Sequence, residues 1–112
     1  MIFNFTSTVE YDNYALQIDS VANYLISHDD NYMNKEIGAS AGIRPYEWYF
    51  NKKVDLVNLS GSHADRWIFL GFDLKEFNQT KYDYIITNTK WQHENYTKIY
   101  QKGSIRLHER NF

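Results

Sequence analysis

The stretch STVEYDNYALQIDSVANYLIS, residues 7–27, decides the fold class because it predicts a long helix near the start of the chain. Ser7 and Glu10 have the spacing of a capping box, in which each side chain satisfies a backbone N–H group of the first turn. Further along, apolar side chains recur with the spacing of one helix face: Tyr14, Ile18, Val21 and Leu25. The helix is expected to end near Ser27.

Beyond this helix, the side chains alternate as they do in β-strands. Five segments are predicted to be strands: 46–50, 54–60, 66–74, 82–89 and 104–112. A further short strand is expected at 1–5, where Phe3 and Phe5 would share a face. Segment 66–74 has apolar residues on both faces, which is typical of a central strand.

Two segments fit neither the long helix nor the strands. Residues 28–45 contain few large apolar side chains and the run GASAG, so we expect a mobile loop there. Residues 90–103 are predicted to form a second, short helix that Gly103 would close. The chain is therefore expected to be a single α+β domain over residues 1–112. Its mostly antiparallel sheet would have four to six strands, with the long N-terminal helix packed on one face.

Composition narrows the class of protein. The chain has 112 residues, no cysteine, and 12 basic against 14 acidic side chains, so no overall charge attracts nucleic acid or an anionic membrane. It shows neither a secretory signal pattern nor an apolar run of the roughly 18 residues that a membrane helix needs. No histidine pair has zinc-site spacing, and no glycine loop has a phosphate-binding pattern. We expect a cytoplasmic protein without metal or cofactor.

Aromatic residues are unusually frequent, at 18% of the chain with ten tyrosines. Such a surplus is typical of binding faces, although a genome rich in A and T would produce a similar composition. The segment RPYEWYF, residues 44–50, offers the following anchors: Arg44, Tyr46, Trp48 and Tyr49. The leading hypothesis is a non-enzymatic protein that binds another protein, in the manner of an immunity protein or a phage-encoded inhibitor. The same face could equally form a homodimer.

The C-terminal strand offers a different chemistry. Alternation places Arg106, His108 and Arg110 on one face, where they could hold a phosphate group. One alternative function is therefore a metal-independent ribonuclease, with His63 and His108 as base and acid. Another is a domain that binds a phosphorylated small ligand such as a signalling nucleotide. Charges on an edge strand also discourage edge-to-edge pairing, which explains the same residues without any ligand.

The stretch SGSHADRW, residues 60–67, could be an active-site loop in which Asp65 orients His63. Its Gly and Ser residues are equally those of a turn between two strands, and the arrangement does not match a nucleophilic-serine elbow. We therefore interpret it as a polar turn. His28 and His93 are the other two histidines, and whether the four converge is left open by the sequence.

Overall fold

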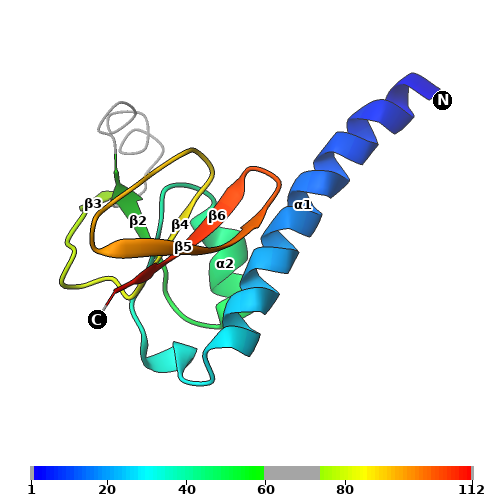
Figure 1. Cartoon of the computed structure of the whole chain (residues 1–112). Coiled ribbons are helices and arrows are strands. Elements are labelled where there is room, and N and C mark those ends of the chain that lie inside the picture. Colours follow the sequence, from blue (N-terminus) through cyan, green and yellow to red (C-terminus); the bar gives the residue numbers. More distant parts are fainter. Residues whose placement is uncertain (1, 60–73, 112) are drawn as a thin grey trace.

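Two helices and a six-stranded sheet make up the described part of the chain (Figure 1). The computed structural model describes residues 2–59 and 74–111, with the backbone alone for residues 2–13. The elements are α1 (Ile2–His28), a 3-10 turn η1 (Tyr32–Asn34), β1 (Ile37–Ala39), α2 (Ile43–Phe50), β2 (Asp55–Asn58), β3 (Leu74–Glu76), β4 (Tyr84–Thr87), β5 (Tyr96–Lys102) and β6 (Ile105–Arg110). The predicted α+β class and the long N-terminal helix on one face are confirmed.

The strand order is β3-β2-β1-β4-β6-β5. Strands β3, β2, β1 and β4 run parallel, and β6 pairs antiparallel with both β4 and β5. The sheet is therefore mixed, and the prediction of a mostly antiparallel sheet is wrong. The physical reason is α2, which carries the chain from β1 back to the start of β2 and so makes these two strands parallel.

Helix α1 begins at Ile2, so the strand predicted at 1–5 is wrong. Its end at His28 agrees with the predicted end near Ser27. The expected face is present from Ile18 onward, where Ile18, Val21 and Leu25 are buried. The first half of α1 extends away from the sheet (Figure 1).

The segment predicted as strand 46–50 is helical and belongs to α2. Gly42, with φ of 67°, precedes the helix, and Asn51, with φ of 53°, follows it. Tyr46 and Phe50 lie one helical turn apart and are both buried in the core. Aromatic side chains favour strands by propensity, but here packing at a spacing of four residues decides the conformation.

The segment predicted as a second helix, 90–103, contains strand β5 instead. β-Branched and aromatic residues dominate its course, and Gly103 with φ of 61° lies in a tight turn that leads into β6. Residues 28–45, predicted to be a loop, contain η1 and β1 and reach into α2. Strands β2, β4 and β6 confirm three predicted segments, and 66–74 lies outside the described residues except for Leu74, the first residue of β3.

The two faces of the sheet are covered differently. On one face, α1 and α2 pack against the sheet through residues that include Leu25, Phe50 and Leu107. On the opposite face a smaller cluster of Val57, Tyr82, Ile85 and Tyr96 is covered by side chains from loops. Within the described residues, no helix covers this second face.

Asp83 connects the central strands at the edge where β1 and β4 begin. Its Oδ2 accepts a hydrogen bond from the backbone N–H of Glu36 at 2.9 Å, and its Oδ1 accepts one from Nη2 of Arg110 at 2.9 Å. The backbone of Asp83 donates to Glu36 O and accepts from the N–H of Arg110, each at 2.9 Å. One residue thus holds the start of β1, the start of β4 and the end of β6 together.

Gly38, in the middle of β1, allows the sheet to pack closely at its centre. A Cβ atom there would lie 2.6 Å from Cγ2 of Val57 and 3.1 Å from Cδ1 of Ile85.

Gly38→Ala is therefore expected to lower the free energy of unfolding by about 1–3 kcal/mol, measured by urea denaturation. Because Val57→Ala removes the nearest atom, the two substitutions should couple by about 1 kcal/mol in a double-mutant cycle. Strictly additive costs would contradict this explanation.

Candidate functional site

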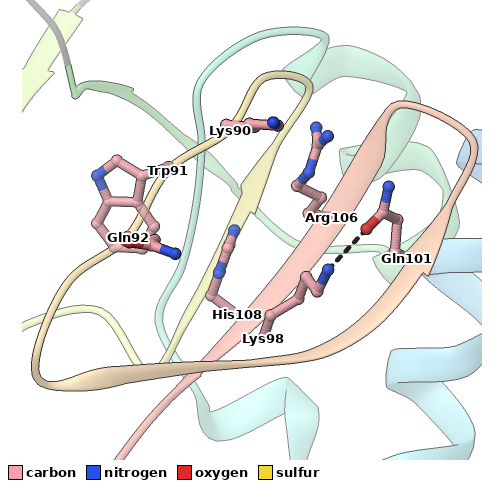
Figure 2. A pocket seen from close by; sticks show the side chains of 7 residues that line it. All are labelled: Lys90, Trp91, Gln92, Lys98, Gln101, Arg106 and His108. Atoms are coloured by element: carbon pink, nitrogen blue, oxygen red, sulfur yellow. Dashed lines mark hydrogen bonds between the residues drawn. The ribbon is translucent and has the colours of Figure 1, made fainter.

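A pocket of about 670 Å³ opens on the face of the sheet opposite the two helices. The loop after β4 forms one side of it, and the β5–β6 hairpin forms the other (Figure 2). Ile105 and Leu107 point to the helices, so alternation directs Arg106 and His108 to this second face. The described lining residues are Lys90, Trp91, Gln92, Lys98, Gln101, Arg106 and His108.

A β-bulge places two of these side chains. Lys98 pairs with His108 and Gln101 pairs with Arg106, with a register shift between Lys98 and Tyr100. In a regular strand, residues three apart point to opposite faces. The extra residue at the bulge lets both Lys98 and Gln101 face the pocket.

The pocket is positively charged. Its described lining contains Lys90, Lys98 and Arg106 and no carboxylate. Lys98 donates to Oε1 of Gln101 at 2.7 Å, and Nη1 of Arg106 donates to the carbonyl oxygen of Ser104 at 2.8 Å. Neither partner is charged, and among the described residues none of the three cations forms an ion pair. Their charge is therefore available to an anion.

His108 is buried beneath these cations, with 3% of its surface exposed. Its Nε2 lies 3.1 Å from Oγ1 of Thr87, with which it shares a hydrogen bond. Burial, reinforced by the charges of Arg106 and Lys98, lowers the pKa of His108 to about 4. The imidazole is therefore neutral near pH 7, where it has no added proton to give and is a weaker base than an exposed histidine.

Trp91 stands beside His108, with ring centroids 4.9 Å apart and the ring planes nearly perpendicular. It also packs edge to face against Phe77 and Tyr96. A second hollow of about 510 Å³ adjoins the first and shares Trp91, Gln92, Lys98 and His108 with it. Its other described lining residues are His93, Glu94, Tyr96 and Thr97.

The structure separates the two arginines that the sequence placed on one face. Arg106 lies opposite Thr87, near the end of β4, and lines the pocket. Arg110 lies at the other end of β4, where it pairs with Asp83 and donates to the carbonyl oxygen of Gln79 at 3.3 Å. Arg110 therefore has a structural role, and it does not line the pocket.

The four residues expected as anchors for a partner do not share one face. Tyr46 is buried, with 3% of its surface exposed, whereas Trp48 is 77% exposed. In the strand predicted at 46–50, alternation would put these two side chains on one face; α2 is instead a helix, in which residues two apart point in nearly opposite directions. Tyr49 is half-buried against Trp48 with ring centroids 5.0 Å apart, and Arg44 is exposed.

The histidines fall into separate places. His28, at the end of α1, pairs with Glu109 at 3.0 Å. His93 lies 5.9 Å from Trp91 between ring centroids, so His93 and His108 flank the same indole. His63 and the whole stretch 60–67 lie outside the described residues. The pairing of His63 with His108 thus stays a prediction.

Sequence reasoning identified Arg106 and His108 but missed the other five described lining residues: Lys90, Trp91, Gln92, Lys98 and Gln101. Lys90, Trp91 and Gln92 lie in the segment that was predicted to be helical, so their place beside β6 was not visible. The position of Lys98 in the pocket could be predicted only from the register of the hairpin together with its bulge. The signal that could have found them is the turn at Gly103, which pairs residues 96–102 with the C-terminal strand.

Comparison of the chain with protein-family models, with curated proteins and with solved structures finds no match. The functional argument therefore depends on the geometry alone. Among the described residues, no three acidic, histidine or cysteine side chains are grouped so that they could hold a metal ion. No helix in residues 2–59 and 74–111 is long and apolar enough to cross a membrane.

The buried imidazole predicts a pH dependence of stability. An unfolded histidine takes up a proton near pH 6.5, whereas His108 in the folded protein does so only near pH 4. Between these two pH values the unfolded state therefore binds more protons than the folded state. The free energy of unfolding should fall by about 2 kcal/mol when the pH is lowered from neutral to about 5. Urea denaturation near neutral pH and near pH 5 measures this fall.

The matched variant is His108→Gln, which keeps a hydrogen-bonding side chain but cannot titrate. In this variant the free energy of unfolding should fall much less between neutral pH and pH 5 than in the wild type. Asp29 and Asp55 do not replace the effect of His108, because their pKa values are below 3.8 and they titrate at lower pH. An equal pH dependence in both proteins would show that His108 is not the group responsible.

Proposed function

We propose that the protein binds a phosphorylated small molecule in the pocket between the loop after β4 and the β5–β6 hairpin. The observation that carries this proposal is the convergence of Lys90, Lys98 and Arg106 around one hollow whose described lining has no carboxylate. The pocket volume of about 670 Å³ is within the range of small-molecule sites. An anion is the ligand that three unneutralised cations would attract most strongly.

Phosphate fits this lining better than a carboxylate does. Arg106 can present two parallel N–H groups, and each lysine adds a mobile charge, so three oxygens of one or two phosphate groups can be contacted together. Gln101 adds an amide that already orients Lys98.

The proposal predicts that Arg106→Gln weakens the binding of inorganic pyrophosphate by about tenfold or more, because a charge-assisted hydrogen bond is lost. Lys98→Gln should weaken it by a smaller factor. Isothermal titration calorimetry at low salt measures both. Lys102→Gln is the matched control, since Lys102 lies on the same hairpin, is exposed and does not line the pocket.

Binding of pyrophosphate that is equally strong in Arg106→Gln and Lys102→Gln would contradict the assignment to this pocket. Absence of any saturable binding to the wild type would contradict the function itself. Arg106→Lys separates the contribution of the paired N–H groups to pyrophosphate affinity from the contribution of the positive charge. It keeps the cation but loses the paired N–H groups.

We propose binding to another protein through α2 as a second function, favoured by Trp48. This indole is 77% exposed and is held edge to face by Tyr49. Tryptophan is among the residues that most often dominate the affinity of a protein interface. The partner would be a toxin, a host factor or a second copy of the chain, as expected for an immunity or inhibitor protein.

Trp48→Ala should then weaken partner binding by about thirtyfold or more without changing stability. The measurement is affinity capture from host lysate, with sedimentation velocity to detect self-association. Met33→Ala is the control, because Met33 is also exposed, at 47%, but is not part of α2. A partner retained equally by Trp48→Ala and Met33→Ala would argue against this site.

A further inference from the structure

Phosphate binding accounts for only one side of the pocket. Figure 2 shows Arg106 and Gln101 on one side of the hollow and Trp91 with Gln92 on the other. His108 and Lys98 lie between them. An anion held by the cations would leave the exposed part of the indole and the amide opposite without a contact to the ligand.

Trp91 is fixed in position by its neighbours. Phe77, Tyr96 and His108 each pack against it at steep ring angles, with ring centroids 4.9–5.5 Å from that of the indole. The indole is nevertheless not buried, and it lines both adjoining hollows. His93 stacks on the indole with an interplanar angle of 23°. The part of this rigid side chain that stays exposed beside the cations is suited to a flat ring that carries a phosphate group.

We infer that the phosphorylated ligand is a nucleotide whose base stacks on Trp91 while its phosphates face Arg106, Lys98 and Lys90. This inference rests on the proposed phosphate binding and deepens it. Gln92 can both donate and accept, as the edge of a base requires. The three cations match the charge of a nucleoside diphosphate more closely than that of a monophosphate.

The ligand is a free nucleotide and not a nucleic-acid strand. A strand needs a basic groove that follows many phosphates, whereas the chain has a net charge of −2 and the described lining of the pocket contains three cations. The volume of about 670 Å³ suits one nucleotide.

The test compares three probes on the wild-type protein by calorimetry: pyrophosphate, adenosine and ADP, with GDP and UDP to vary the base. We expect the best nucleoside diphosphate to bind about ten- to a hundredfold more tightly than pyrophosphate, because stacking adds to phosphate binding. Adenosine alone should bind weakly. A single-stranded octanucleotide that binds more tightly than every mononucleotide would overturn the assignment to a free nucleotide.

Trp91→Leu should reduce nucleotide affinity to about the level of the pyrophosphate affinity measured on the same variant, because the stacking contribution is lost. Retained pyrophosphate binding also shows that this variant is folded. Trp91→Phe keeps an aromatic ring in the cluster and should cause a smaller loss. Nucleotide should also quench tryptophan fluorescence in the wild type and in Trp48→Phe, but not in Trp91→Leu.

The two proposals fail in different ways. If pyrophosphate binds in a manner that depends on Arg106 but nucleotides bind no more tightly, and Trp91→Leu has no effect, the nucleotide inference is wrong and phosphate binding stands. If neither pyrophosphate nor any nucleotide binds, both are wrong.

Discussion

The side chain and backbone of Asp83 determine how the central strands meet, and the other elements depend on that junction. Its carboxylate accepts hydrogen bonds from the backbone N–H of Glu36, the residue before β1, and from Arg110. The side chains of Asp83 and Arg110 are at most one-fifth exposed. Hydrogen bonds to a charged group with little solvent access are among the stronger polar contributions to stability, at about 1.5–3 kcal/mol each. With β1, β4 and β6 fixed at one end, the C-terminal hairpin has a defined position beside the parallel strands. The arginine used for this purpose is no longer available to a ligand, so the two arginines of β6 have different roles.

The pocket follows from the way the hairpin joins the sheet. β6 runs antiparallel to β4, which brings Arg106 beside the end of β4 and the loop that carries Lys90 and Trp91. The bulge in β5 then turns Lys98 toward the same hollow. Because the helices of the described chain pack on the other face, this hollow stays open to solvent. Topology, register and a single inserted residue together place charges that are far apart in sequence next to one another.

The sequence predicted those elements whose local pattern agrees with their tertiary environment. The buried face of α1 and the strands β4 and β6 are of this kind, and so are Arg106 and His108 on one strand face. The prediction failed where packing overrode propensity. Tyr46 and Phe50 are aromatic residues typical of strands, yet they pack as neighbours on a helix, and that helix makes the sheet mixed. Lys98 could not be assigned to the pocket, because a bulge changes which residues share a face and alternation alone does not reveal it.

Strand β5 is at one end of the strand order, so its outer backbone groups have no neighbouring strand among the described residues. Such an edge invites pairing with the edge of another molecule, and charged side chains on it are a common protection. Lys98 and Lys102 are both exposed on this strand. Lys98 therefore lies both on the exposed edge strand and in the lining of the pocket. Replacing Lys98 with an apolar residue would remove a charge that disfavours strand pairing between molecules. The resulting aggregation would resemble a defect in folding.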